Sequence, residues 1–78
     1  MENIGEEIRK RRKELGLKVY ELAEKVGVNP VYITQIEKHN KLPSIEVFIK
    51  ISHILKFTKS MNMLYLKFKY PKIGYLLI

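Results

Sequence analysis

The stretch from Leu22 to Glu37 constrains the fold of this 78-residue chain more than any other part of its sequence. It contains two short amphipathic segments separated only by Gly27-Val28-Asn29. Gly27 suits the left-handed residue that ends a helix, and Asn29 before Pro30 suits the N-cap that begins the next one. So short a connection cannot bring two antiparallel helices side by side. The sequence therefore predicts two helices that cross at a large angle.

Two further short helices are predicted, one on each side of this unit. The segment 3–15 begins with a capping box, Asn3 followed three residues later by Glu6, and the segment 44–55 begins with Ser44 as its N-cap. Together with helices over 18–26 and 29–39, they predict a compact all-α domain of four to five helices. The predicted core residues recur at helical spacing: Ile4, Ile8, Leu15, Val19, Leu22, Ala23, Val26, Ile33, Ile36, Ile45, Phe48, Ile51, Ile54 and Leu55.

The pattern changes after Phe57, so we divide the chain into a domain over 1–57 and a tail over 58–78. Thr58 or Ser60 can cap a short fifth helix, but from Leu64 the apolar residues alternate with others, which favours a strand. A turn over 71–74 and the apolar residues 75–78 predict a second strand. The tail can pair across a two-fold axis, cover the core of its own domain, or be a frameshifted or truncated terminus without selected structure. The sequence leaves these three explanations open.

Composition restricts the class of protein. The chain has no cysteine, so neither a disulfide nor a cysteine-based zinc site can stabilise it. The N-terminus lacks the apolar core of a secretory signal, and no apolar run approaches the length of a membrane span. We therefore expect a cytoplasmic protein that does not associate with membranes.

The net charge of +7 is confined to the second half of the chain. Residues 1–37 carry seven Lys or Arg and seven Glu, whereas residues 38–78 carry eight Lys and only Glu46. A basic excess of this kind favours a polyanionic partner such as nucleic acid or an anionic membrane surface.

The sequence gives no support for catalysis. The two histidines, His39 and His53, suit ordinary surface positions. The acids are all Glu, and most of them are at positions expected to be solvated. No HExxH pattern, glycine-rich phosphate loop or nucleophile–base pair is present. We expect no enzyme, no cofactor and no metal site.

Two helices joined as in the Leu22–Glu37 unit form a helix-turn-helix, whose second helix can enter the major groove of DNA. Ile33 and Ile36 face inward, and the N-terminal part of the opposite face meets base edges in this motif. The amide of Gln35 can form two hydrogen bonds with an adenine edge, and Val31 can pack on a thymine methyl group. The alternative is an ordinary solvated face. The candidate base contacts are Pro30, Val31, Thr34 and Gln35.

A second set of residues lies near helix N-termini, where unpaired backbone N–H groups and the helix dipole attract phosphate. Each of these residues alone is an ordinary solvated residue, but together they form the group expected on the DNA backbone. Tyr32 belongs to it because its hydroxyl can reach a phosphate or a sugar. The candidate backbone contacts are Lys18, Asn29, Tyr32, Lys38, Asn40, Lys41 and Ser44.

Residues 3 to about 55, roughly two thirds of the chain, resemble the phage-repressor-like, XRE-type helix-turn-helix family. The resemblance implies a five-helix, repressor-like DNA-binding domain that is usually a homodimer on a near-palindromic operator and regulates transcription. Arg12 falls near the inward side of its helix, where a charge needs a partner, and the family implies that this partner is Glu37. The resemblance is carried by Ile8, Arg12, Leu15, Gly16, Leu17, Leu22, Ala23, Gly27, Val28, Ile33, Ile36, Glu37, Pro43, Ser44 and Ile51.

The chain departs from the family pattern at three places. Lys18-Val19 replace the usual Ser or Thr followed by Gln, and Val19 cannot make the DNA contact that Gln makes. His39 replaces a common Gly, so Asn40 is expected to take the left-handed position. Beyond residue 57 the resemblance stops, because the usual apolar pattern of the fifth helix, including Leu where this chain has Lys59 and Asn62, is not kept.

Two functions fit these features. The first is a sequence-specific DNA-binding transcriptional regulator, with the helix over about 30–38 in the major groove of double-stranded DNA. The alternative is a protein-interaction module on the same fold, such as an antitoxin or a coactivator-like adaptor, in which Val31, Tyr32 and the tail contact a partner.

Overall fold

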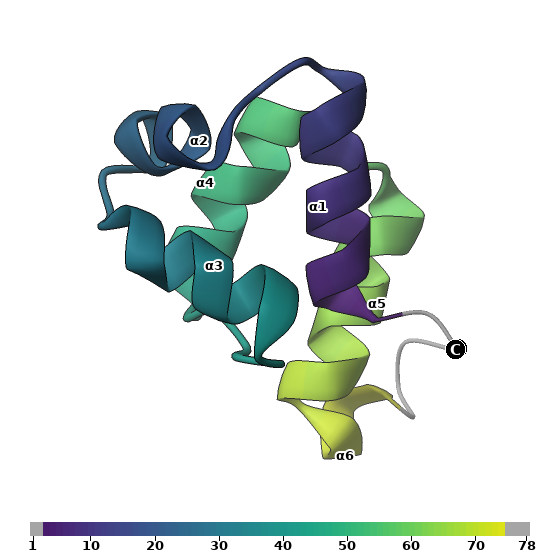
Figure 1. The fold of residues 1–78 in the computed structure, drawn as a ribbon. Helices are drawn as coiled ribbons and strands as arrows, with labels where there is room; N and C mark the ends of the chain where they lie inside the picture. The colour runs from purple at the N-terminus through teal and green to yellow at the C-terminus, as the bar shows by residue number, and fades with distance from the viewer. Residues whose placement is uncertain (1–2, 75–78) are drawn as a thin grey trace.

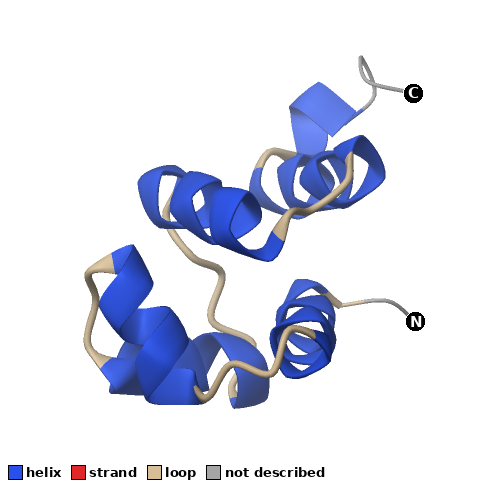
Figure 2. Cartoon of the chain, turned by 90° about the horizontal axis from the view of Figure 1, so that it is seen from above, coloured by secondary structure: helices blue, strands red, loops and turns tan. Residues whose placement is uncertain are grey.

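The computed structural model describes residues 3–74, which form six helices and no strand (Figure 1). The predicted all-α fold is confirmed, and the first four helices lie within two residues of their predicted bounds. Seen from above, α4 and α5 lie side by side in a layer behind α1 and the α2–α3 unit (Figure 2). In chain order the helices are α1 (Ile4–Glu14), α2 (Val19–Val26), α3 (Pro30–Lys38), α4 (Ile45–Leu55), α5 (Lys59–Lys69) and α6 (Pro71–Gly74).

Side-chain caps explain where the helices begin. The side-chain oxygens of Asn3, Asn29 and Ser44 each accept a hydrogen bond from a backbone N–H in the first turn of the helix that follows. Lys18 has no acceptor with which to cap α2. Instead, the carboxylate of Glu21 reaches back and accepts the backbone N–H of Lys18 at 2.8 Å, so one of the unpaired groups at this helix end is satisfied.

The turn between α2 and α3 depends on Gly27, whose φ of 87° lies in the left-handed region. Its N–H and that of Val28 both donate to the carbonyl of Ala23, at 2.8 and 3.0 Å. A second glycine permits the close crossing of α1 and α3. A Cβ on Gly5 would overlap the carbonyl oxygen of Ile36, so only glycine fits this position with the two backbones where they are.

One hydrophobic core joins all five long helices. Most of its members were predicted from helical spacing, whereas Tyr65 was not. Leu15 and Ile45, which were predicted to face the core, are 39% and 40% exposed; both lie at the very ends of helices, where the packed surface stops. The buried apolar residues are Ile4, Ile8, Leu22, Ala23, Val26, Ile33, Ile36, Phe48, Ile51, Leu55 and Tyr65.

The strand predicted from Leu64 onward is wrong, because α5 continues through this segment to Lys69. Thr58 caps α5, as predicted for one of two candidates. Met61, Leu64 and Tyr65 follow the three- and four-residue spacing of a helix face and pack on the core, which overrides the alternation that suggested a strand. The predicted turn over 71–74 is the short helix α6, and the second predicted strand, 75–78, lies outside the described residues. Of the three explanations for the tail, the described part supports the second: it covers the core of its own domain.

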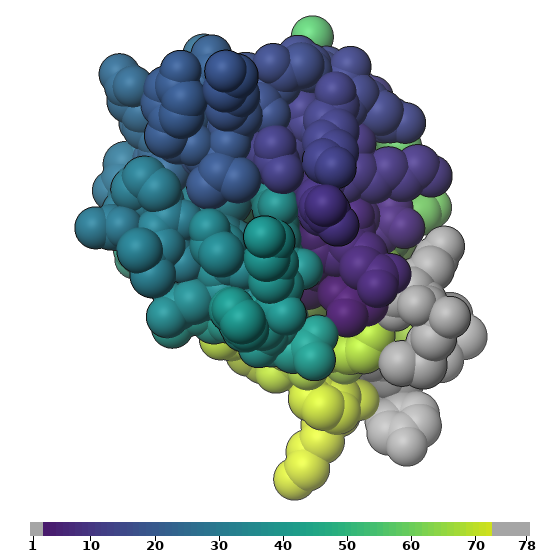
Figure 3. Space-filling model, viewed as in Figure 1, coloured from purple at the N-terminus to yellow at the C-terminus, as the bar shows by residue number. Residues whose placement is uncertain are grey.

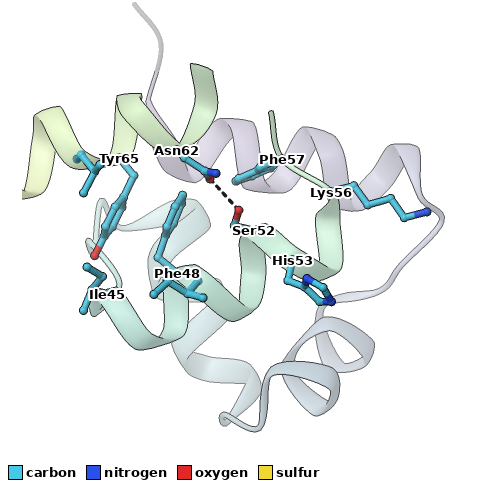
Figure 4. Close-up of a pocket in the computed structure, with 10 residues that line it drawn as sticks. Ile45, Phe48, Ser52, His53, Lys56, Phe57, Asn62 and Tyr65 are labelled. Carbon is cyan, nitrogen blue, oxygen red and sulfur yellow. Dashed lines mark hydrogen bonds between the residues drawn. The ribbon is translucent and has the colours of Figure 1, made fainter. Parts of the chain in front are cut away.

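Tyr65 fixes α5 against α4. Its ring stacks on Phe48 with ring centres 3.9 Å apart and planes within 4°, and its hydroxyl donates to the carbonyl of Pro43 at 2.7 Å. Asn62, which stands where the family has an apolar residue, accepts a hydrogen bond from the hydroxyl of Ser52 at 2.7 Å (Figure 4). A polar pair thus replaces an apolar contact between the two helices.

No helix in the described part of the chain combines the length and the apolar character that a membrane span requires.

Candidate nucleic-acid interface

The outward face of α3 carries the four candidate base contacts. Ile33 and Ile36 are fully buried beneath it, so α3 is fixed to the core along one side. Val31 is 59% exposed and Pro30 is also exposed, whereas Thr34 and Gln35 are half-buried. Figure 3 views the surface formed by α1, α2 and α3, and no other element covers α3 in this view. The structure therefore presents these side chains on one accessible surface.

A buried ion pair anchors the end of α3 to α1. Arg12 donates from Nε and Nη2 to the two carboxylate oxygens of Glu37, at 2.7 and 2.9 Å, and from Nη1 to the carbonyl of Leu17 at 2.7 Å. The two side chains are only 9% and 2% exposed. This is the pair that the family resemblance implies, and its two parallel bonds fix direction as well as distance.

Arg11, next to Arg12 in α1, has a structural role that the sequence did not indicate. Arg11 donates from Nε to the carbonyl of Leu55 at 2.9 Å and lies 3.4 Å from Glu14. It therefore satisfies a carbonyl in the last turn of α4. Spacing within α1 reveals the Glu14 contact, but the contact with α4 depends on tertiary packing.

Four of the candidate backbone contacts meet at the α3–α4 loop, residues 39–44: Tyr32, Asn40, Lys41 and Ser44. The hydroxyl oxygen of Tyr32 accepts the backbone N–H of Ser44 at 3.1 Å, so the hydroxyl proton can still be donated to a phosphate. The ammonium of Lys41 lies 5.1 Å from the centre of the Tyr32 ring, within the range of a cation–π contact. Tyr32 thus links α3 to the N-cap of α4 and places Lys41 beside it.

Asn40 adopts the left-handed conformation expected from the missing glycine, with φ of 55°. Its side-chain oxygen accepts a hydrogen bond from Nδ2 of Asn3 at 3.0 Å. Asn3 was identified in the sequence only as a helix cap, because nothing in the spacing of residues 3 and 40 signals that they touch. This contact brings the start of α1 to the α3–α4 loop.

The other candidate backbone contacts lie apart from this cluster. Lys18 and Lys38 are exposed at the start of α2 and the end of α3. Asn29 is exposed, but its side-chain oxygen is occupied by the N–H of Val31 at 2.9 Å. Only its side-chain NH2 can therefore be offered to a phosphate.

A groove of about 730 Å³ lies between α4 and α5, on the side turned away from α1 and the α2–α3 unit (Figure 4). Phe48, Phe57 and Tyr65 line it. Ile45 and Ile49 stand at its margin and are 40% and 59% exposed. The groove is an apolar surface separate from the exposed face of α3.

The chain is similar to known helix-turn-helix proteins in sequence and in structure. A family model described as helix-turn-helix matches residues 8–60. The HTH-type transcriptional regulators SinR of Bacillus subtilis (strain 168) and of Bacillus licheniformis are each 43% identical to this chain over 53 residues, which are 67% of this chain and 48% of each relative. The chain therefore spans about half the length of these curated relatives. A solved SinR protein/SinI protein complex is similar with a TM-score of 0.62 and 27% identity, covering 95% of this chain and 85% of that one.

Proposed function

This chain belongs to the phage-repressor-like, XRE-type helix-turn-helix family, and we propose that it is a sequence-specific DNA-binding regulator of transcription in the cytoplasm. The observation that carries the proposal is the way α3 is held. Buried Ile33 and Ile36 fix one side of the helix, the Arg12–Glu37 pair fixes its end, and the opposite side is exposed. A rigid helix with one free face is what insertion into the major groove requires.

In the proposed complex, the first turns of α3 contact the base edges. Gln35 bonds an adenine through its amide, and Val31 packs on a thymine methyl group. Pro30 and Thr34 contact the neighbouring base pairs. Because Val31 and Pro30 are apolar, we expect part of the sequence preference to come from apolar contact and from the shape of the DNA.

The DNA backbone is held on both sides of α3. One group, at the α3–α4 loop, consists of Tyr32, Asn40, Lys41 and Ser44, and Lys38 contacts a phosphate from the end of α3. Lys18 and Asn29 contact phosphates at the start of α2 and of α3. Several of these residues are cations, so affinity should fall steeply with salt concentration.

We further propose that the protein binds DNA as a homodimer in which a second copy covers the groove between α4 and α5. The exposed Ile45 and Ile49 give this groove its apolar margin, and its position behind α3 leaves the DNA-contacting face free. Two copies related by a two-fold axis would present two α3 helices to successive major grooves.

Selection of bound duplexes from random-sequence DNA, followed by a salt titration with the selected site, tests the main proposal. We expect a sequence preference that includes an adenine, and loss of that preference at one position in Gln35→Ala. Arg9→Ala, which removes an exposed cation on α1, is the matched control and should keep the preference. Absence of any sequence preference at low salt would overturn the proposal.

A second candidate function is a protein-interaction module on the same fold. It is favoured by the exposure of Val31 and by the fact that the similar solved structure is a complex with a second protein. Gln35→Ala separates the two functions, because a module of this kind keeps its partner while a DNA-binding protein loses its base preference.

A further inference from the structure

Two hydrogen bonds in series determine which way the side chain of Asn40 faces. The backbone N–H of Glu6 donates to Oδ1 of Asn3 at 3.1 Å, and Nδ2 of Asn3 donates to Oδ1 of Asn40 at 3.0 Å. A backbone N–H can only donate, so the oxygen of Asn3 must face α1 and its NH2 group must face Asn40. Asn40 must therefore turn its own oxygen towards Asn3, and its NH2 group points away from that contact.

The NH2 group of Asn40, which has no hydrogen-bond partner among residues 3–74, belongs to the loop that carries other proposed phosphate contacts. Asn40 is exposed and precedes Lys41, which lies beside the Tyr32 ring. The acid that precedes this loop most closely in sequence, Glu37, is buried in its pair with Arg12. The start of the loop thus offers donors and a cation to the outside, which is the chemistry that a phosphate group accepts.

We propose that Asn3 is a positioning residue for DNA binding: it holds the Asn40 amide so that the NH2 group, rather than the carbonyl oxygen, meets a phosphate. This inference rests on the proposed function. Without Asn3, the Asn40 amide can rotate about its last side-chain bond and present its oxygen, which a phosphate repels. The N-cap of α1 therefore orders a side chain in the DNA-contacting loop 37 residues away.

A double-mutant cycle on DNA affinity tests this role. Asn3→Ser keeps an oxygen that can cap α1 but removes the donor to Asn40. Asn40→Gly suits the left-handed backbone and removes the amide. With a duplex that the wild-type protein binds, we expect Asn40→Gly to weaken binding about tenfold, as for loss of a hydrogen bond to a charged group, and Asn3→Ser to weaken it about three- to fivefold. In the Asn40→Gly background, Asn3→Ser should have no further effect.

Salt dependence separates this role from a general one. Neither variant removes a cation, so both should keep the wild-type slope of log affinity against log salt, whereas Lys41→Ala should reduce the slope by about 0.9. Urea unfolding of Asn3→Ser should stay close to wild type, because the cap is retained.

A second variant reverses the proposed orientation. Asn3→Asp still caps α1 but presents only acceptors to Asn40, so the NH2 group should turn inward and binding should fall further than in Asn3→Ser. Its added charge also acts on DNA, and the same variant in the Asn40→Gly background measures that contribution. Equal losses from the Asn3 variants in both backgrounds would overturn the inference. If the wild-type protein bound no DNA, the proposed function itself would fail.

Discussion

Gly5 in α1 and Ile36 in α3 approach so closely that the carbonyl oxygen of Ile36 occupies the place where a side chain at position 5 would begin. This contact sets the spacing of the helix that anchors the domain and the helix that we propose enters DNA. Replacing a glycine inside a helix by alanine normally stabilises the helix. At position 5 the opposite is expected, because the added methyl group has no room.

We therefore expect Gly5→Ala to destabilise the domain by about 1–3 kcal/mol, because α1 and α3 must move apart to admit one methyl group. Urea unfolding measures the change. Ser60→Ala, in the exposed first turn of α5, controls for helix propensity and should alter the free energy of unfolding by no more than about 0.5 kcal/mol. A stabilised Gly5→Ala protein would contradict this account of the crossing.

Removing one partner of the Arg12–Glu37 pair should cost far more than removing a surface pair. Arg12→Ala leaves the Glu37 carboxylate buried without its cation, and we expect a loss of about 3–5 kcal/mol. Glu14→Ala removes the exposed partner of Arg11 and should cost less than about 1 kcal/mol. Replacing both buried partners, in Arg12→Met with Glu37→Leu, should restore much of the stability. If it restored none, the unpaired charge would not be the cause of the loss.

Alkaline pH should weaken the fold through Tyr65. Burial, with smaller contributions from Tyr70 and Tyr32, raises the pKa of Tyr65 from 10.0 to about 12. The folded protein therefore holds this proton more tightly than the unfolded chain does. The resulting stability is fully present below pH 10 and decreases as the pH rises towards 12.

Tyr65→Phe gives the corresponding test. It leaves the Pro43 carbonyl without its donor and should cost about 1–2 kcal/mol at neutral pH. The difference from wild type should narrow above pH 10, since the variant has no proton to lose at this site. Tyr20→Phe, at a ring that is 58% exposed, should change stability at neutral pH by less than about 0.5 kcal/mol. A constant difference across the alkaline range would count against the role of the Tyr65 proton.

Tyr32→Phe in α3 and Lys41→Ala in the α3–α4 loop should weaken DNA binding in different ways. Tyr32→Phe removes a neutral donor and orphans the N–H of Ser44, so affinity should fall about fivefold without a change in salt slope. Lys41→Ala removes a cation, so its effect should shrink as salt is raised. Titrations at several salt concentrations distinguish these outcomes, and identical slopes for the two variants would remove Lys41 from the proposed phosphate contacts.

Ile49→Glu should prevent formation of the proposed homodimer. The side chain is 59% exposed at the groove, so the substitution places a charge on the proposed interface at little cost to the fold. We expect a mass measurement in solution to shift from dimer to monomer. Lys10→Glu also introduces a glutamate at an exposed position, but on α1 and away from the groove. This variant should leave the mass as in wild type. A wild-type monomer, alone and on DNA, would exclude the dimer.

The sequence predicted those parts of the structure that depend on local rules. The first four helices, the caps of α1, α3 and α4 and the turn at Gly27 follow from spacing and from the conformations that Asn, Ser and Gly favour. The same pattern predicts that Ile33 and Ile36 face inward and that Val31 faces outward from α3.

The remaining features depend on contacts between residues far apart in the chain. The apolar residues alternate from Leu64 to Tyr70, which favours a strand, but Met61, Leu64 and Tyr65 also fit the spacing of one face of a helix. Only the packing of Tyr65 against Phe48 decides between the two patterns. Likewise, Asn62 breaks the apolar pattern expected of the fifth helix, and only its hydrogen bond with Ser52 of α4 explains how α5 packs there. The contacts of Asn3 with Asn40 and of Arg11 with Leu55 carry no sequence signal at all.

The hydrogen bond from Tyr65 to Pro43 has a consequence for the length of the functional unit. Pro43 directly precedes the N-cap of α4 and lies in the α3–α4 loop, which we propose contacts the DNA backbone. A chain that ended at residue 57 would release this loop as well as expose the Phe48 ring. We therefore expect the smallest fragment that folds and binds DNA to extend at least to Tyr65. In this protein, α5 lies in the segment whose sequence departs from the family pattern, and it also holds the α3–α4 loop of the helix-turn-helix domain in place.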